Sequence, residues 1–232
     1  MSESDLTTPF DWHRFWTEAD GDRRRSAHVG QYGKADLLAQ FFETRGVPDS
    51  VASFGCGPAA CPIELATRYP ETAVHGYDAA PSAIAEARER IADRGLENVT
   101  VAVDHLPEPN VDRSFDLVYC YATLHYVDDV ETALRELFAR VADGGHLVFN
   151  YPNRLTLSTY RRLVRGEADR PLPGDPDDFR ERYRLVFAER NLLSYDRVET
   201  ILGRRPRSFW SVVERPDAPW IGRDNPLVYV RN

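Results

Sequence analysis

Residues 50–66 read Ser-Val-Ala-Ser-Phe-Gly-Cys-Gly-Pro-Ala-Ala-Cys-Pro-Ile-Glu-Leu-Ala, and this stretch decides the fold. Its apolar run, Val51 to Phe54, ends in the turn Gly55-Cys56-Gly57, and a helical pattern begins at Pro58 or Pro62. Short apolar runs that end in glycine are typical of buried strands, and proline is common in the first turn of a helix. The stretch therefore predicts a strand, a tight glycine turn and a helix.

The glycine turn is a candidate ligand site, because a Cβ at these positions would block a ligand from approaching the backbone. The helix that follows adds unpaired N–H groups and a partial positive charge at its first turn. A Gly-x-Gly pair alone is a weak signal, since it is compatible with a dinucleotide site and with an ordinary turn.

Two acids after the next two apolar runs favour the ligand site. The run Ala73–Tyr77 ends at Asp78, about 20 residues past the glycines, where a carboxylate can accept from both hydroxyls of a ribose. The run Val99–Val103 ends at Asp104, which His105 follows. Two acids at successive strand tips suit an adenosine, one for the sugar and one for the adenine amino group. A helix cap and a strand-end turn are the alternative roles of these two acids.

From residue 50 to residue 150 the chain resembles the class I S-adenosylmethionine (SAM)-dependent methyltransferases. The resemblance rests on the order and spacing of five pieces, which are Ser53-x-Gly55-x-Gly57-x-Ala59, Asp78, Asp104, the segment Phe115–His125 and the segment Leu137–Phe149. Members of the family usually carry an acid where Ser53 stands and a third glycine where Ala59 stands. The first departure bears on the contact near the methionine amino group.

The resemblance implies an α/β fold, a Rossmann-like doubly wound seven-stranded sheet with a C-terminal antiparallel hairpin and a helical lid insertion. It also implies SAM as the cofactor and methyl transfer to a small-molecule acceptor as the activity. Cofactor contacts are then expected from the glycine turn and the tips of the following strands: Ser53, Gly55, Cys56, Gly57, Asp78, Ala79, Asp104, His105 and Tyr121.

The alternation of patterns independently predicts the sheet. Predicted strands cover residues 51–54, 73–77, 99–103, 115–121 and 146–151, and predicted helices cover 33–46, 62–69, 82–94 and 130–141. Such alternation is typical of a parallel sheet with helices on both faces. Ligands of these sheets bind at the carboxyl ends of the strands, where Gly55, Asp78, Asp104 and Tyr121 all fall.

The alternation stops after Tyr151. Residues 155–164, 177–189 and 191–202 predict helices, and residues 208–213 and 226–230 predict two closing strands. We expect a single methyltransferase domain over residues 1–232, divided into an N-terminal helical cap (1–46), a SAM-binding core (50–151), a helical lid (152–190) and a closing helix with strands (191–232). In the lid, the arginines either attract an anionic substrate or form a solvated face: Arg161, Arg162 and Arg165.

Methyl transfer from a sulfonium depends on orientation and exclusion of water, so a catalytic dyad is not required. Residues 121–125 follow the fourth predicted strand and face the expected position of the methyl group. His125 is the candidate base and Tyr121 a second candidate catalytic residue, while Tyr121 and Tyr126 offer ring faces to the sulfonium. Packing in the core is the alternative for all three.

The N-terminal part holds two further candidates. The aromatic segment Phe10–Trp16 either closes over the cofactor, as such segments do in the resembling family, or packs as a helix on the core. Tyr32 and Lys34 precede the helix predicted at 33–46 and are candidates for the methionine carboxylate. A solvated lysine is the alternative for Lys34.

Composition narrows the class of protein. The 232 residues carry a formal charge of −8, which disfavours nucleic-acid binding. Cys56, Cys61 and Cys120 form no CxxC pair, which predicts free thiols in a reducing compartment and no metal site. A basic leader and an apolar run of about 18 residues are both missing from the sequence, so we expect a cytoplasmic protein without a membrane partner.

Two other functions stay open at this point. A nicotinamide-dependent oxidoreductase of the short-chain type would carry Tyr-x-x-x-Lys downstream of the glycine turn, whereas the only lysine, Lys34, lies upstream. A non-catalytic SAM-fold binding protein is compatible with Ser53 and Ala59. The sequence holds no Gly-x-Ser-x-Gly element of an α/β-hydrolase and no signature of the acceptor or of the oligomeric state.

Overall fold

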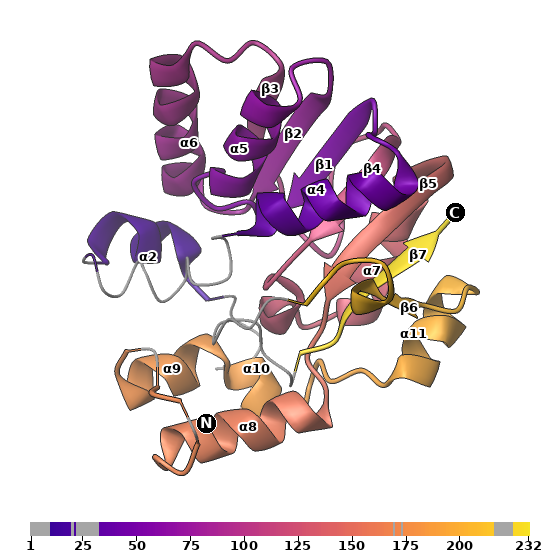
Figure 1. Ribbon diagram of the computed structural model, residues 1–232. Helices are drawn as coiled ribbons and strands as arrows, with labels where there is room; N and C mark the ends of the chain where they lie inside the picture. The colour runs from indigo at the N-terminus through magenta and orange to yellow at the C-terminus, as the bar shows by residue number, and fades with distance from the viewer. Residues whose placement is uncertain (1–9, 20, 22–32, 169, 173, 216–224) are drawn as a thin grey trace.

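The computed structural model contains a seven-stranded sheet in the order β3-β2-β1-β4-β5-β7-β6 (Figure 1). It describes residues 10–19, 21, 33–168, 170–172, 174–215 and 225–232. Strands β1 to β5 pair in parallel, whereas β7 runs antiparallel to both β5 and β6. The predicted doubly wound sheet with its C-terminal antiparallel pair is thus confirmed. The strands are β1 (Ser50–Phe54), β2 (Ala73–Asp78), β3 (Val99–Val103), β4 (Phe115–Cys120), β5 (Val141–Asn150), β6 (Arg207–Ser208) and β7 (Leu227–Arg231).

Helices cover both faces of this sheet (Figure 1). Successive side chains of a strand point to opposite faces, and β1 shows this directly, since Val51 packs with α4 and α5 while Ala52 packs with α7 and α11. The core therefore has two apolar layers, one on each side of the sheet. Helix α6 packs beside α5. The helices that cover the sheet are α4 (Lys34–Arg45), α5 (Ala60–Arg68), α6 (Pro81–Arg94), α7 (Val130–Ala139) and α11 (Tyr195–Leu202).

The register of the parallel strands brings the predicted site residues to one edge. Phe54 of β1 pairs with Tyr77 of β2, and Asp78 pairs with Val103 of β3. The backbone N–H of Asp104 donates to the carbonyl of Asp78 at 3.1 Å. The glycine turn and both acids are consequently neighbours at the carboxyl ends of the strands.

The helical insertion packs as a unit of its own beside this edge. It holds α8 (Arg154–Val164), α9 (Pro176–Arg182) and α10 (Arg184–Phe187), which lie together near α2 (Trp12–Glu18) in Figure 1. Its arginine cluster is exposed, with Arg161 bound to Glu189 at 3.2 Å and Arg165 near Glu167 at 3.6 Å. The structure therefore favours a solvated face over an anion site for this cluster. The buried side chains that join the three helices are Leu157, Tyr160, Leu163, Phe179 and Val186.

One helix of the insertion is broken, contrary to the prediction of a single helix over 177–189. The chain leaves helical geometry at Tyr183, with φ −102° and ψ 24°. The Tyr183 ring lies 4.7 Å from the ring of Tyr160 and 5.3 Å from that of Tyr126, centroid to centroid. These long-range ring contacts fix the side chain and override the local helical pattern.

The closing elements also differ from the prediction. The helix predicted from Asn191 begins at Tyr195, because the Ser194 hydroxyl caps it by accepting from the N–H of Arg197 at 3.1 Å. The strand predicted over 208–213 is reduced to β6, which the 3-10 turn η2 (Phe209–Ser211) follows. The ring of Phe209 stacks on Phe41 at 5.3 Å, so the chain turns into the core there.

Asn191 ties the insertion to the loop after β4. Its amide Nδ2 donates to the carbonyls of Leu124, His125 and Val127 at 3.0, 2.9 and 3.2 Å, and the residue is fully buried. We expect Asn191→Ala to lower the free energy of unfolding by about 2 kcal/mol, because it leaves buried carbonyls without a donor. Urea denaturation measures this loss.

Ser194→Ala is the matched control for Asn191→Ala. It removes only an exposed helix cap and should cost about 1 kcal/mol. Equal losses in the two variants would show that the buried amide contributes no more than an ordinary cap.

Candidate functional site

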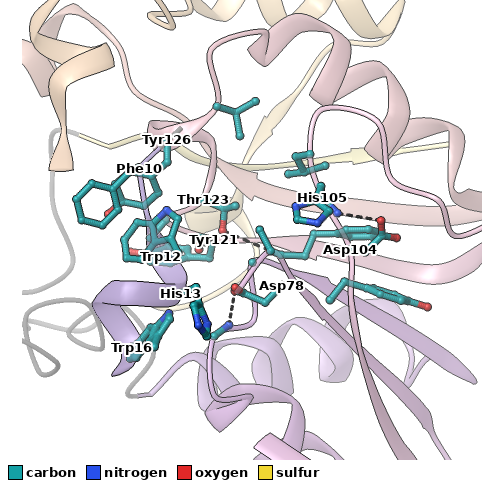
Figure 2. A pocket seen from close by; sticks show the side chains of 18 of the residues that line it. Phe10, Trp12, His13, Trp16, Asp78, Asp104, His105, Tyr121, Thr123 and Tyr126 are labelled. Atoms are coloured by element: carbon teal, nitrogen blue, oxygen red, sulfur yellow. Dashed lines mark hydrogen bonds between the residues drawn. The ribbon is translucent and has the colours of Figure 1, made fainter. Parts of the chain in front are cut away.

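A cavity of about 550 Å³ lies at the carboxyl ends of β1 to β4 (Figure 2). Aromatic rings of the N-terminal segment stand on one side of it, and Asp104 with His105 stands on the other. Of the nine predicted cofactor-binding residues, seven line this cavity: Gly55, Gly57, Asp78, Ala79, Asp104, His105 and Tyr121.

Ser53 and Cys56 do not line the cavity. Ser53 lies within β1 and is 5% exposed. Cys56 is buried, and its thiol donates to the carbonyl of Gly57 at 3.4 Å. A Cβ added to Gly76 would lie 3.0 Å from the Cys56 sulfur, so this thiol packs beneath β2. Both residues are thus buried in the core and do not form part of the cavity wall.

The glycine turn is held by the strand beside it. Gly55 and Cys56 both donate their N–H groups to the carbonyl of Tyr77, at 2.8 and 3.0 Å. Gly55 has φ +72°, and a Cβ on it would lie 1.9 Å from Oγ1 of Thr123. Glycine is therefore required here by the Thr123 side chain as well as by any ligand, and the sequence alone did not reveal that contact.

Ala59 occupies the place where the family usually has its third glycine. It keeps the left-handed conformation, with φ +55° and ψ +33°, and is completely buried at the N-cap of α5. Non-glycine residues adopt this conformation at a cost of about 1–2 kcal/mol. The turn therefore keeps a glycine-like backbone despite the substitution.

Asp78 connects the tip of β2 to the glycine turn. Its Oδ2 accepts from the N–H of Gly57 at 2.7 Å and its Oδ1 accepts from the N–H of Ala80 at 2.9 Å. Burial raises the pKa of this carboxyl above its ordinary value, and the two N–H donors oppose that shift. Since a carboxylate accepts about four hydrogen bonds, each oxygen keeps one acceptor position for a ligand in the cavity.

Asp104 organises its own loop. Its carboxylate accepts from the backbone N–H groups of His105, Asn110 and Val111 and from the Asn110 amide, at 2.8–3.2 Å. Burial acts to raise the pKa of this carboxyl, but these donors outweigh it and the pKa is lowered. Asp104 therefore holds the turn at the end of β3, which was the alternative role predicted for it. Its bond to an adenine amino group stays a prediction.

A buried lysine lies beside Tyr121, which lines the cavity. The ammonium of Lys34 lies 3.7 Å from the ring centroid of Tyr121, and Lys34 is 2% exposed. Burial lowers the pKa of this ammonium well below its ordinary value. The solvated alternative for Lys34 is thus wrong. Tyr32, its companion candidate, lies outside the described residues.

The N-terminal segment Phe10–Trp16, predicted either to close over the cofactor or to pack on the core, contributes side chains to the cavity wall. Phe10, Trp12, His13 and Trp16 line the cavity together with Tyr126 and Thr123. The Trp12 ring lies 4.6 Å from the ring of Tyr126, so α2 contacts the loop after β4 across the cavity. The aromatic density of the segment was the available signal, but a sequence cannot tell a cavity wall from a core-packing face.

His125, the predicted base, does not line the cavity. It belongs to the 3-10 turn η1 (Leu124–Tyr126), which turns its ring toward Tyr160 and Tyr183 of the insertion. Its Nε2 lies 3.1 Å from Oδ1 of Asn225, which also accepts from the Thr156 hydroxyl, so Nε2 carries the proton. Burial lowers the pKa of His125 to about 4. This environment fits the packed, hydrogen-bonded alternative.

The buried imidazole predicts a pH-dependent stability. Unfolded His125 titrates near 6.5 and folded His125 near 4, so protonation favours the unfolded chain. The stability that His125 contributes should be complete above pH 6.5 and should decline as the pH falls from 6.5 to about 4. Urea denaturation of wild type and His125→Gln over this range measures the contribution.

The control for this pH experiment is His13→Gln, which alters an exposed histidine. Its stability profile should run parallel to that of the wild type. Parallel profiles for the wild type and His125→Gln would instead show that His125 ionises as freely in the folded chain as in the unfolded one.

Comparison with known proteins agrees with this arrangement. Residues 52–147 match the family model described as a methyltransferase domain. The trans-aconitate 2-methyltransferase of Methylobacterium nodulans is 36% identical over 135 residues, which are 57% of this chain and 50% of that protein. The trans-aconitate 2-methyltransferase of Methylobacterium radiotolerans is 30% identical over 170 residues, which are 72% of this chain and 60% of that protein. The chain therefore spans between half and 60% of the length of these relatives.

A solved structure extends the likeness in fold to nearly the whole chain. Magnesium protoporphyrin IX methyltransferase of Synechocystis PCC 6803, solved with bound S-adenosylhomocysteine (SAH), gives a TM-score of 0.62 at 14% identity over 96% of this chain and 93% of that one. Within the described ranges, no helix has the length and apolar character needed to cross a bilayer. The sheet order and the solved structure agree in fold, and residues 52–147 match a methyltransferase domain.

Proposed function

We propose that this chain binds SAM and transfers its methyl group to a small-molecule acceptor. The observation that carries the proposal is the Asp78 carboxylate, which is tied to the glycine turn and lines the cavity of about 550 Å³. A carboxylate in this position can accept from both hydroxyls of a ribose. The match of residues 52–147 to a methyltransferase domain and the small-molecule names of the relatives support the same activity.

The residues that would hold the nucleoside lie on three neighbouring strand tips. In this proposal Asp78 and Ala79 bind the ribose, and the Asp104–His105 pair lies beside the adenine. The backbone of Gly55 to Gly57 approaches the amino-acid part of SAM, and Ser53 and Cys56 support that backbone from the core. Tyr121 covers the methionine end, in front of the Lys34 ammonium.

SAM supplies an activated methyl group and a neutral leaving group when bound. The chain then contributes orientation and exclusion of water, which are worth up to about 7–11 kcal/mol in favourable systems. Phe10, Trp12 and Tyr126 exclude water on the side where the rings of Trp12 and Tyr126 meet at 4.6 Å. With His125 outside the cavity wall, we assign it no proton transfer.

A non-catalytic binding protein and a nicotinamide-dependent oxidoreductase are the competing functions. Ala59 keeps the left-handed backbone of a glycine at the turn. This argues against the non-catalytic alternative, in which the turn would no longer need to keep the shape of a ligand site. A short-chain oxidoreductase would need a catalytic lysine downstream of the glycine turn. The only lysine of the sequence is Lys34, which belongs to α4, upstream of that turn, and packs on the ring of Tyr121. We place the reaction in the cytoplasm, since Cys56, Cys61 and Cys120 are buried as thiols and not joined in disulfides.

Calorimetry of the full chain with SAH and with NADH tests the proposal. We expect SAH to bind and to raise the melting temperature, and NADH to do neither. Methyl transfer from radiolabelled SAM to a panel of small acceptors that includes trans-aconitate then tests turnover. Binding of NADH without SAH would favour the oxidoreductase, and no response to millimolar SAH would remove the proposal.

A further inference from the structure

Arg182, the last residue of α9, is buried, and the described part of the chain gives it no acidic partner. It is 3% exposed, and among the described residues no carboxylate oxygen lies within 4.0 Å of its guanidinium. Its neighbours on the same segment are all paired. Arg180 is exposed and lies 2.9 Å from Asp177, and buried Arg184 lies 3.6 Å from Glu181. Arg182 therefore stands apart from the other arginines of this segment.

The described groups around Arg182 that an interaction joins to it are aromatic rings, which carry no negative charge. Its guanidinium carbon lies 5.4 Å from the ring centroid of Phe15 and 5.8 Å from that of Tyr183. Such cation–π contacts contribute about 0.5–2 kcal/mol, whereas a buried charge without a counter-charge costs several kcal/mol. An arginine cannot escape this cost by losing its proton. Within the described residues, the guanidinium of Arg182 is therefore left without a counter-charge.

The position of Arg182 connects it to the cavity. Phe15 belongs to α2, whose Trp12 and Trp16 line the cavity. Tyr183 packs at 5.3 Å on Tyr126, which also lines it. Arg182 consequently contacts the cavity wall through the aromatic rings of Phe15 and Tyr183. This wall is separate from the one that Asp78 and Asp104 form.

The described part of the cavity wall includes acids but no lysine or arginine, so the guanidinium of Arg182 is a candidate for binding an anionic group. Among the described residues that line the cavity there are three aspartates, at positions 11, 78 and 104, and no lysine or arginine. Burial raises the pKa of Tyr126 well above its ordinary value, so Tyr126 stays neutral. On the side of the insertion, a permanent positive charge is therefore surrounded by neutral rings.

We propose that Arg182 is a specificity-determining residue that binds an acid group of the methyl acceptor, and that the acceptor is a small carboxylic acid. The inference rests on the proposed methyltransferase function. A guanidinium offers two parallel N–H donors that match the two oxygens of a carboxylate. Because Arg182 is nearly closed off, the acid group must displace its ring contact with Phe15 or Tyr183 on binding.

Calorimetry on the SAH-saturated full chain at pH 7.5 tests the inference. The probes are phenylacetate, glutarate and tricarballylate, each compared with its amide. In the wild type, we expect at least one acid to bind at least tenfold more tightly than its amide. Arg182→Met should abolish this preference. Arg182→Lys should retain part of it, because the charge remains and the two-pronged geometry is lost.

Arg180→Met is the matched control, since it removes an exposed arginine of the same helix. It should keep the acid preference of the wild type. The inference is overturned if the wild type binds no acid more tightly than its amide at probe concentrations up to about 10 mM, which corresponds to a binding free energy of about −3 kcal/mol. It is also overturned if Arg182→Met keeps the preference.

The design separates this inference from the proposed function. SAH affinity is measured first in every variant, so loss of SAH binding in the wild type refutes the methyltransferase proposal itself. Normal SAH binding without acid preference refutes only the role of Arg182. If Arg182→Met does not fold, Arg182→Lys decides, and an acid preference equal to that of the wild type would overturn the assignment.

Discussion

Replacing Asp78 by alanine is expected to raise the dissociation constant for SAH about 100-fold. In the proposed complex the carboxylate accepts from two ribose hydroxyls, and hydrogen bonds to a charged group contribute about 1.5–3 kcal/mol each. The loss of both bonds amounts to about 3 kcal/mol, and each 1.4 kcal/mol is about tenfold in affinity. The variant also removes the acceptor of the Gly57 N–H, which bonds to Asp78 at 2.7 Å.

The control for this prediction is Asp116→Ala. Asp116 accepts from the N–H and the hydroxyl of Ser50 at 2.8 and 2.7 Å, at the opposite end of the sheet from the cavity. Its loss should reduce stability and leave the dissociation constant for SAH unchanged. Calorimetry on both variants measures the contrast. A folded Asp78→Ala chain that binds SAH within threefold of the wild type would remove Asp78 from the cofactor site.

The sheet was predictable from the sequence because its strands are nearly continuous apolar runs. β3 matches its prediction to the residue, since Val99–Val103 is bounded by polar residues on both sides. The acid at the tip of β2 was predictable for a related reason. Parallel register places strand ends together, so a carboxylate that follows an apolar run must lie near the glycine turn.

Side-chain direction at the strand tips was not predictable. His125 follows the fourth strand in the sequence, which predicted a position near the methyl group. The sequence did not reveal that the η1 turn directs its ring to Asn225, 100 residues further along. The five contacts of Asp104 arise within its own loop, but they depend on how residues 105–111 fold back. Arg182 gave no signal either, because its burial without an acid partner among the described residues is a property of the packed state.

The same limit explains the broken helix of the insertion. Local propensity over 177–189 is helical, and the break at Tyr183 follows from ring contacts with residues 126 and 160. Contacts between residues far apart in the sequence thus decide which face of the insertion meets the cavity. The core can be predicted from patterns, whereas the acceptor side of the site requires the three-dimensional structure.

Gly55→Ala is expected to lower the free energy of unfolding by about 4 kcal/mol, from two sources. The left-handed conformation of Gly55, with φ +72°, costs a residue with a side chain about 1–2 kcal/mol. The new Cβ would lie 1.9 Å from Oγ1 and 2.5 Å from Cγ2 of Thr123. Overpacking of this kind costs about 1–3 kcal/mol more. Urea denaturation measures the sum.

Two further variants separate these sources. Gly95→Ala has the same backbone problem, with φ +61°, but nothing lies within 4 Å of the added Cβ, so it should lose only about 1–2 kcal/mol. The double variant Gly55→Ala with Thr123→Gly should fall back to that level. If Gly55→Ala is no worse than Gly95→Ala, then Thr123 yields to the new side chain. The requirement for glycine would in that case come from the ligand, and the variant should lose SAH affinity while it keeps its fold.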